Sequence, residues 1–321
     1  MRLIDTHHHY VPDFYAQAVE AAGGDPSGWP TPSWSPHGSV ESMERNGSTK
    51  AILSLTAPGA VIADTDEGRR FLARKANDYA ASLRDEDPEK WGFFAALPCL
   101  LDVEGTLAEI RYALDVLGAE GVTLFTRYGP GNHYLGHEDF KPIWAELNAR
   151  RAVVFIHPTH PADTTRVNPL LPQPAIDYPH ETTRTAVDLI ITNTKRSYPN
   201  CKVILSHAGG TLPYLISRIS TVSREAIASR IYGKTSAEIL DDFQSFYFDL
   251  ALSSSPAVLR LVLEMIPHNH LLYGSDYPYA SPDKTLGFKQ LLDDFPMDQD
   301  LRDMIYFKNA QSIFAATEKA Q

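Results

Sequence analysis

Eight short apolar runs that alternate with segments of helical periodicity predict a single (β/α)8 TIM barrel for this sequence of 321 residues. Two further observations support this fold class. Residues able to bind a metal close four of the runs. Histidines follow the first run, where an open doubly wound sheet usually carries a glycine-rich phosphate loop. We therefore expect the carboxyl ends of the strands to meet at one mouth of a barrel.

The predicted strands are rich in β-branched and aromatic residues and end at Pro, Gly or polar residues. In chain order they are Leu3 to Ile4 with the histidines that follow, Lys50 to Leu55, Gly92 to Leu97, Gly121 to Phe125, Val153 to Ile156, Val203 to Ser206, Phe246 to Leu250 and Leu271 to Ser275. Helical periodicity predicts helices between them at Glu67 to Leu83, Val103 to Leu117, Phe140 to Arg150, Thr182 to Thr194, Leu212 to Ala228 and Ala257 to Met265.

Three segments interrupt this alternation and predict extended loops after strands 1, 4 and 5. Gly23 to Gly38 is rich in proline and contains two tryptophans, Tyr128 to His137 is rich in Gly, His and Tyr, and Thr159 to Tyr178 is punctuated by Pro. Such loops lie at the barrel mouth, where they can cover a site. We expect their aromatic residues either to stack on a flat substrate or to pack the loops on the barrel: Trp29, Trp34, Tyr128 and Tyr134.

Length and composition predict one domain over residues 1–321. The net charge of -11 argues against nucleic acid as a partner, and the lack of an 18-residue apolar stretch argues against a membrane span. Because the N-terminus leads into a strand without a basic, apolar leader, we expect a soluble, cytoplasmic protein. Cys99 and Cys201 are too few and too far apart for a disulfide framework or a thiolate metal site.

Four predicted strands end in residues that can bind a metal. His7 and His9 lie on one side of the first strand, because strand side chains alternate and the histidine between them points away. His157, His207 and Asp276 follow the fifth, sixth and eighth strands. One polar residue at a strand end is usually structural, but several that converge on one barrel mouth are seldom explained by packing alone. The sequence therefore predicts a metal site.

This pattern resembles the metal-dependent amidohydrolase superfamily. The strand-1 His-x-His, strand-5 His, strand-6 His and strand-8 Asp of that superfamily match the five residues in order and spacing. Its binuclear members carry a metal-bridging lysine at the end of strand 4, and the segment Thr123 to Arg127 has none. The resemblance therefore implies one divalent metal ion, with Zn2+ as first choice and Mn2+ as the alternative, held by His7, His9, His157 and Asp276.

Two short segments are similar to sequences of the branch that contains aminocarboxymuconate-semialdehyde decarboxylase. They are His207-Ala208-Gly209-Gly210 and Leu272 to Pro278. The carboxylate-binding arginine that the muconate-type enzyme has before strand 2 has no clear counterpart here. Dihydroxybenzoate and resorcylate decarboxylases usually carry Glu in the strand-1 motif. The sequence most closely resembles fungal 6-methylsalicylate decarboxylases. Four segments carry this resemblance: Gly23 to Trp29, Gly121 to Gly129, Val153 to Pro161 and Asp177 to Glu181.

The resemblance implies a carboxy-lyase that decarboxylates an ortho-hydroxybenzoic acid without redox change, most closely 6-methylsalicylate to 3-methylphenol and CO2 in polyketide secondary metabolism. By analogy with the family, Asp276 donates the proton to the ring, and His207 tunes Asp276 or shuttles the proton. The alternatives are a decarboxylase of a related hydroxybenzoate, a mononuclear metal hydrolase acting on a lactone or amide, and a non-catalytic binding protein.

Five residues are candidates for substrate contact. Arg127 either pairs with the substrate carboxylate or forms a structural ion pair. Arg218 lies eleven residues after His207, the position from which a related decarboxylase reaches into a neighbouring subunit, and so implies a homodimer or higher homo-oligomer. His180 opens the helix after strand 5. The aromatic candidates are Trp29 and Tyr128.

Overall fold

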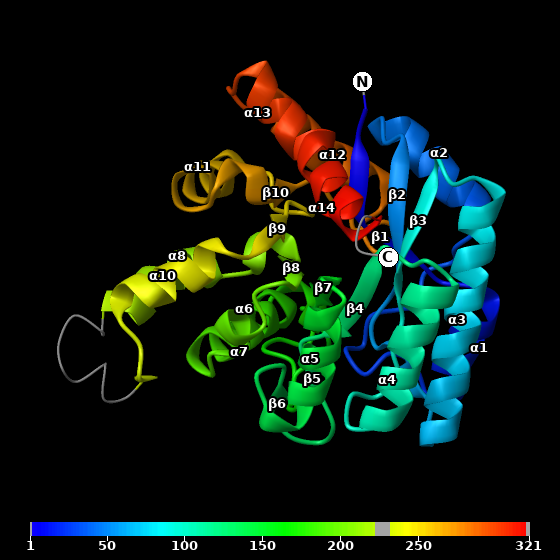
Figure 1. Cartoon of the computed structure of the whole chain (residues 1–321). Coiled ribbons are helices and arrows are strands. Elements are labelled where there is room, and N and C mark those ends of the chain that lie inside the picture. The colour runs from blue at the N-terminus through cyan, green and yellow to red at the C-terminus, as the bar shows by residue number, and fades with distance from the viewer. Residues whose placement is uncertain (1, 222–231, 319–321) are drawn as a thin grey trace.

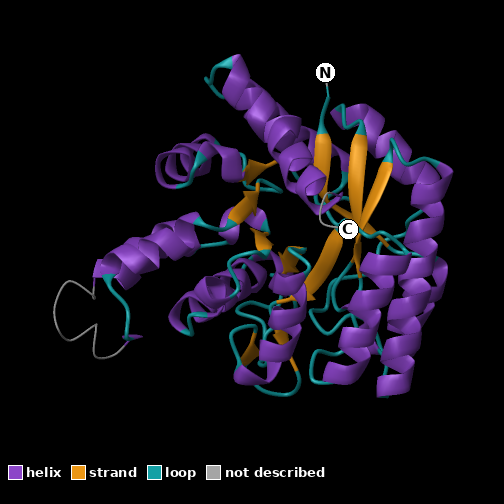
Figure 2. Cartoon of the chain, viewed as in Figure 1, coloured by secondary structure: helices purple, strands orange, loops and turns teal. Residues whose placement is uncertain are grey.

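Eight parallel strands form a barrel with helices around it in the computed structural model, which describes residues 2–221 and 232–318 (Figure 1, Figure 2). This confirms the predicted (β/α)8 fold. In sheet order the strands are β1 (Ile4–Tyr10), β2 (Lys50–Leu55), β3 (Trp91–Ala95), β4 (Gly121–Phe125), β7 (Val153–His157), β8 (Lys202–Leu205), β9 (Tyr247–Asp249) and β10 (Leu271–Leu272).

The barrel closes between its last and first strands. The Thr6 N–H donates to Tyr273 O at 3.0 Å, and the Asp276 N–H donates to His7 O at 2.9 Å. A further parallel bridge joins His8 to Tyr277. Because these contacts continue beyond the short strand β10, they bring Asp276 beside the histidines of β1.

The helices surround the strands in Figure 2. They are α1 (Asp13–Ala21), α2 (Pro36–Asn46), α3 (Asp66–Glu86), α4 (Val103–Arg111), α5 (Lys141–Ala149), α6 (Asp177–Ile191), α7 (Thr194–Ser197), α8 (Leu212–Thr221), α10 (Ser236–Gln244), α11 (Pro256–Met265), α12 (Pro282–Asp294), α13 (Gln299–Asp303) and α14 (Asn309–Glu318). The predicted helix from Leu212 to Ala228 begins as α8, and its residues beyond Thr221 lie outside the described part of the chain.

All three predicted loops contain regular structure. Thr159 to Tyr178 includes a 3-10 helical turn at Gln173–Ala175 and the start of α6. The end of Gly23 to Gly38 is the first turn of α2, where Ser35 Oγ accepts a hydrogen bond from Gly38 N–H at 3.0 Å and Pro36 occupies the first position of the helix. The chain after β4 forms a hairpin of β5 (Arg127–Tyr128) and β6 (His133–Tyr134). Arg127 therefore belongs to this hairpin and not to the barrel strand before it.

Apolar side chains fill the barrel beneath the strand ends. Ile4, Ile52, Phe94, Val153, Phe155, Ile204 and Leu272 form one buried cluster, and Ala310 and Ile313 of α14 join it. The Phe155 ring lies 5.0 Å from the His7 ring, so this apolar cluster reaches the predicted metal site. In the described ranges, no helix is both long and apolar enough to cross a membrane.

Candidate metal site and cavity

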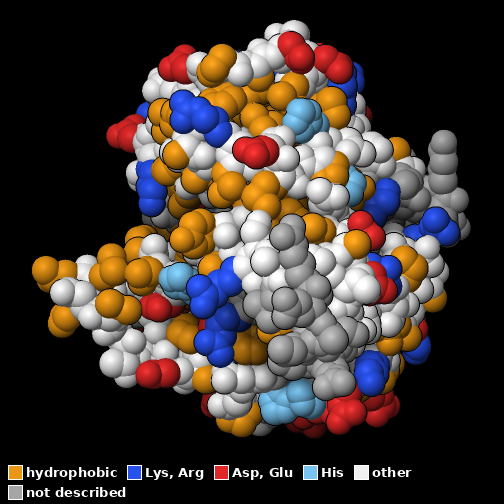
Figure 3. Space-filling model, turned by 90° about the vertical axis from the view of Figure 1, so that its left-hand side faces the viewer, with side chains coloured by type: hydrophobic (Ala, Val, Ile, Leu, Met, Phe, Trp, Pro, Cys, Tyr) orange, Lys and Arg blue, Asp and Glu red, His pale blue; other side chains and the backbone are white. Residues whose placement is uncertain are grey.

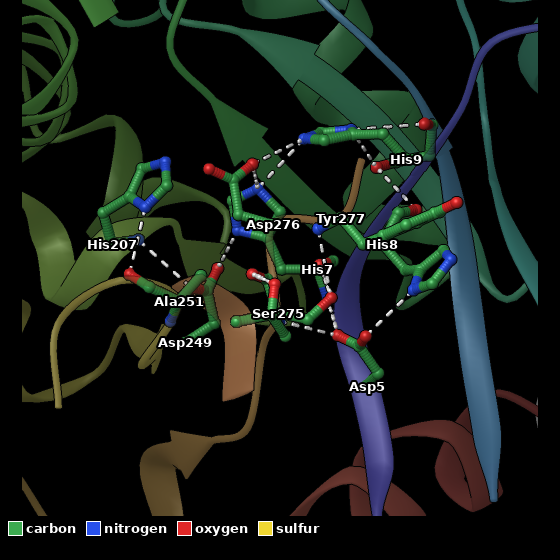
Figure 4. A network of polar contacts seen from close by, with 12 residues as sticks. Asp5, His7, His8, His9, His207, Asp249, Ala251, Ser275, Asp276 and Tyr277 are labelled. Atoms are coloured by element: carbon green, nitrogen blue, oxygen red, sulfur yellow. Dashed lines mark hydrogen bonds and ion pairs between the residues drawn. The ribbon is translucent and has the colours of Figure 1, made fainter. Parts of the chain in front are cut away.

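The structure brings the four predicted metal ligands together from β1, β7 and the segment after β10. Figure 4 shows three of them, His7, His9 and Asp276, with their polar contacts. His7, His9, His157 and Asp276 each offer a ligand atom, and these atoms lie within 4.8 Å of one another. Their side chains are buried in the protein, with residue exposures of 0% for His7 and 8% for Asp276. Residues 269 positions apart therefore form one cluster.

Hydrogen bonds assign the protonated Nδ1 of His7 and orient the His9 ring. His7 Nδ1 lies 3.0 Å from Asp249 Oδ2, and because a carboxylate oxygen only accepts, this Nδ1 carries a proton and Nε2 faces the other candidate ligands. His9 Nδ1 lies 3.0 Å from the Ser54 hydroxyl and 3.3 Å from the Ser54 carbonyl oxygen. This arrangement is typical of histidines that bind a metal through Nε2.

Three acceptor atoms meet at the centre of the cluster and need a cation between them. The two Nε2 atoms lie 3.1 Å apart, and each lies 3.3 Å from Asp276 Oδ1. Burial lowers the pKa of His7, but the Asp249 and Asp276 carboxylates outweigh it and raise that pKa to about 10. The donor set of imidazoles and one carboxylate fits a divalent ion.

His157 of β7 completes the donor set. Its ring lies 5.1 Å from that of His7 and 4.6 Å from that of His9. Burial lowers the pKa of His157 well below its usual value, and the neighbouring histidines lower it further. Its buried Nδ1 has no hydrogen-bond partner among the described residues. The ring is therefore neutral near pH 7 and able to bind a cation.

His207 lies beside the cluster rather than within it. Its Nδ1 donates to Ala251 O at 3.1 Å, which leaves Nε2 as an acceptor, and burial lowers its pKa. Asp249 Oδ1 accepts a hydrogen bond from the His207 N–H at 3.1 Å while Oδ2 holds His7. Asp249 therefore fixes the predicted metal ligand His7 and the segment that carries His207 in one geometry.

A cavity of about 350 Å3 opens next to these groups. His157, His207 and Asp276 line one part of it, and its other walls are largely aromatic and apolar. They include Trp29, Tyr178, Tyr279, Leu252 and Phe288. Asp25 and Lys284 are the other charged residues that line it, and burial raises the pKa of Asp25. A space of this size and character suits a single substituted aromatic ring.

Two of the predicted substrate residues, Arg127 and Tyr128, line a different cavity. The Arg127 guanidinium donates to Gly129 O at 2.7 Å and to His160 O at 3.2 Å. The Tyr128 hydroxyl accepts a hydrogen bond from Phe125 N–H at 3.0 Å, and its ring packs on Phe140. Both residues line a separate cavity of about 540 Å3. In this structure they hold the loop after β4 in place.

The other predicted residues divide between the cavity and the protein surface. Trp29 lines the cavity and is half-buried. His180 is exposed on α6 and Arg218 is exposed on α8, and neither lines the cavity of its own chain. Trp34 packs against Tyr10 in the structure. The hydroxyl of the fourth loop aromatic, Tyr134, donates to a carboxylate of α6.

Sequence reasoning missed several residues of the site. Asp249 stands in the apolar run Phe246 to Leu250, and a charged residue at the end of a buried strand was a usable signal. Tyr178 lies in the segment Asp177 to Glu181, which resembles 6-methylsalicylate decarboxylases, but no contact with the substrate was predicted for it. Tyr279, Lys284 and Phe288 follow Asp276 in a segment for which no element was predicted, so no pattern placed them at the mouth.

A second group of potential ligands lies in the loop after β4 and is less enclosed. It consists of His133, His137 and Asp139, of which Asp139 is exposed. His137 Nδ1 already accepts a hydrogen bond from Asp139 N–H at 3.3 Å. This occupied nitrogen and the exposed position make the group a useful control for metal binding at the barrel mouth.

Comparison with known proteins supports the resemblance seen in the sequence. A 6-methylsalicylic acid decarboxylase of Penicillium expansum is 46% identical over 314 residues, which cover 98% of this chain and 96% of that protein. A 6-methylsalicylic acid decarboxylase of Aspergillus aculeatus is 51% identical over 292 residues, which cover 91% and 88%.

Solved structures share the fold. A protein described as amidohydrolase II has a TM-score of 0.89 at 32% identity, covering 98% of this chain and 99% of that chain. A dihydroxybenzoic acid decarboxylase of Polaromonas, solved with bound manganese and the inhibitor 2-nitroresorcinol, has a TM-score of 0.79 at 23% identity, covering 98% and 96%. A family model described as amidohydrolase matches residues 4–315. Because that match spans the barrel and all four clustered ligands, the chain belongs to the amidohydrolase family.

Proposed function

We propose that this protein is a metal-dependent, non-oxidative decarboxylase of ortho-hydroxybenzoic acids that converts 6-methylsalicylate to 3-methylphenol and CO2. The observation that carries the proposal is the convergence of His7, His9, His157 and Asp276 beside an aromatic cavity of about 350 Å3. Identities of 46% and 51% to two fungal 6-methylsalicylic acid decarboxylases support the choice of substrate and a role in polyketide secondary metabolism.

The cofactor in this proposal is one divalent ion per chain, Zn2+ or Mn2+. Three imidazoles and a carboxylate suit Zn2+, and the manganese in the Polaromonas decarboxylase supports Mn2+ as the alternative. When bound, the ion would anchor the ortho phenolic oxygen and the carboxylate of the substrate and offset their charge. The segment Thr123 to Arg127 lacks a lysine, which supports a single ion.

Proton transfer to the ring is the central step that the protein must supply. Direct loss of CO2 would leave an aryl anion, so the ring carbon that bears the carboxylate is protonated first. Burial raises the pKa of Asp276, but hydrogen bonds from His7 and His9 outweigh it and hold that pKa well below its usual value. Asp276 is therefore a carboxylate at rest, able to take the phenolic proton of the substrate and then deliver it to the ring carbon.

After this protonation, the bond between the ring and the carboxyl group breaks, CO2 leaves and the ring becomes aromatic again as a phenolate. His207 lines the same cavity as Asp276 and presents a neutral ring with a free Nε2. After it takes up a proton from water at Nε2, it can pass that proton to the phenolate before release. Trp29 and Phe288 line this cavity, where contact with the substrate ring would limit its rotation during proton transfer.

The direct test is to incubate the metal-loaded protein with 6-methylsalicylate and follow 3-methylphenol by chromatography and CO2 by trapping. We expect both products in equal amounts, and none from 3-hydroxybenzoate, which has no ortho hydroxyl to give up its proton. Salicylate and 2,6-dihydroxybenzoate then show how the ring substituent is selected. Hydrolysis of a lactone or amide without any decarboxylation would contradict the proposal and favour a metal hydrolase.

Assembly through α8 is a further part of the proposal. Arg218 is exposed, and Tyr214, which is four residues earlier and 78% exposed, lies on the same side of the helix. Tyr and Arg are enriched at protein interfaces. Figure 3 looks onto the side of the molecule that carries α8 and shows further apolar side chains there. We infer a homodimer or higher homo-oligomer in which Arg218 enters the neighbouring cavity.

Arg218→Ala should lower kcat/KM by about ten- to a hundredfold, because hydrogen bonds to a charged group contribute about 1.5–3 kcal/mol. Mixing this variant with Asp276→Asn tests whether Arg218 acts in the cavity of the neighbouring subunit, since each mixed dimer would regain one intact site. Random reassortment in equal amounts should restore about a quarter of the wild-type activity. Light scattering gives the mass, and an active monomer at assay concentration would refute this assembly.

A further inference from the structure

We propose that Lys284 draws anionic substrates into the cavity and favours a carboxylate over a neutral ring, an inference that rests on the proposed function. Of the described residues that line the cavity, Lys284 is the only lysine or arginine. The protein carries a net charge of -11 and therefore repels a carboxylate at long range. Asp25 in the same cavity adds local negative charge. A cation at the mouth offsets this repulsion where the substrate enters.

The first turn of α12 fixes the place of Lys284 relative to the metal site. Ala280 N–H donates to Asp276 O at 2.7 Å, and the Thr285 hydroxyl donates to Ser275 O at 3.4 Å. The Lys284 N–H donates to Ser281 Oγ, which caps the helix. The Thr285 side chain and the turn that precedes α12 therefore tie the helix that carries Lys284 to the segment that carries the proposed proton donor.

The side chain of Lys284 has properties that suit an entry cation. No carboxylate lies within ion-pair distance of its ammonium group among the described residues, whereas its neighbour Asp283 pairs with Arg45 at 2.8 Å. Phe288 follows one helical turn later and lines the same cavity. The two residues together present a positive charge and an aromatic face, which match the two halves of an aromatic carboxylate.

Arg127 cannot take this role in the structure. Its guanidinium is directed at the backbone carbonyls of Gly129, Gly131 and His160, and it lines the other cavity. Lys284 thus replaces Arg127 as the candidate for attraction of the carboxylate. Asp276 is buried and Lys284 is exposed, so their proposed roles differ. Asp276 transfers the proton, and Lys284 attracts the substrate carboxylate as it enters.

The test compares Lys284→Gln and Lys284→Glu with the wild-type holoenzyme, using 6-methylsalicylate at low and high ionic strength. At low salt, kcat/KM should fall about three- to tenfold for Gln and further for Glu, with kcat nearly unchanged. The differences should shrink in 0.5 M salt, because the Debye length is then only about 4 Å. Lys284→Arg should restore the rate, and Lys75→Gln on α3, an exposed lysine outside the cavity, should have no effect.

Inhibition by neutral 3-methylphenol distinguishes a loss of electrostatic attraction for the carboxylate from a change in the shape of the cavity. Its inhibition constant should stay within about twofold of the wild-type value in both Lys284 variants, since it carries no charge for the lysine to attract. An equal change for 3-methylphenol and 6-methylsalicylate, or a loss of kcat/KM that salt does not alter, would overturn the proposal. If the wild-type protein fails to decarboxylate, the proposed function fails, while quenching of Trp29 fluorescence by the two ligands still measures the preference for charge.

Discussion

His157→Ala should remove the metal and the activity together. His157 supplies one of the four clustered donors, and its buried Nδ1 has no partner among the described residues, so its ring is not held by other polar contacts. Loss of a partner that only orients a metal-binding histidine already costs about 10–100-fold in metal affinity, and loss of the ligand itself should cost more. Elemental analysis and turnover, measured on the same desalted preparation, test this prediction.

His137→Ala is the matched control for this experiment. It removes a histidine from the exposed second group while the barrel mouth stays intact, so it should keep one ion per chain and full activity. Full metal content in His157→Ala would refute the ligand assignment. A structure with two adjacent ions at the barrel mouth would refute the single-ion proposal drawn from the missing strand-4 lysine.

Most of the barrel could be predicted because its strands carry strong local signals. Lys50 to Leu55 and Gly121 to Phe125 are observed at the predicted bounds, since both are apolar runs with clear polar or glycine boundaries. The last strand is different. Only Leu271–Leu272 forms a regular ladder, and the chain from Tyr273 to Asp276 pairs with β1 through separate hydrogen bonds. Such closure depends on tertiary contacts that no sequence period records.

The helix α14 was not predicted, for a related reason: it contributes to the fold by packing against the apolar side chains inside the barrel. Ala310 and Ile313 contact residues of strands far away in the sequence. The π-helical turn Tyr112–Val116, which follows α4, was also hidden in a segment predicted to be one continuous helix. Local periodicity reports which side of a helix is apolar, but the partner and the exact backbone geometry depend on the assembled barrel.

The site was predictable where side chains leave the ends of strands and less so in the loops. The four predicted metal ligands lie within or after strands whose direction fixes their common destination. Arg127 also follows a strand, but the hairpin of β5 and β6 turns its guanidinium toward loop carbonyls. Lys284 reaches the cavity from a helix instead. The course of a loop depends on contacts with other loops, which a single sequence does not reveal.

Asp276→Asn should keep much of the metal and lose turnover, and the backbone makes this the informative substitution. Asp276 has a φ of 62°, in the left-handed region that Asn tolerates better than most residues and that strains Ala. An amide oxygen can occupy the position of Oδ1, which lies 3.3 Å from both His7 Nε2 and His9 Nε2. The metal-binding geometry should therefore persist in the variant.

The amide can neither accept the phenolic proton nor deliver one to the ring, so both halves of the proposed proton transfer are lost. General acid catalysis typically contributes about 10²–10⁴-fold, and we expect turnover to fall by that range in metal-replete protein. Metal content, turnover and solvent deuterium incorporation at the product carbon that carried the carboxylate are measured on one preparation. A residue that served only as a ligand would show a milder loss that excess metal restores. Near wild-type decarboxylation by the metal-replete Asn variant would mean that the proton comes from another group, and His207, which lines the same cavity with a free Nε2, would then be the first residue to replace.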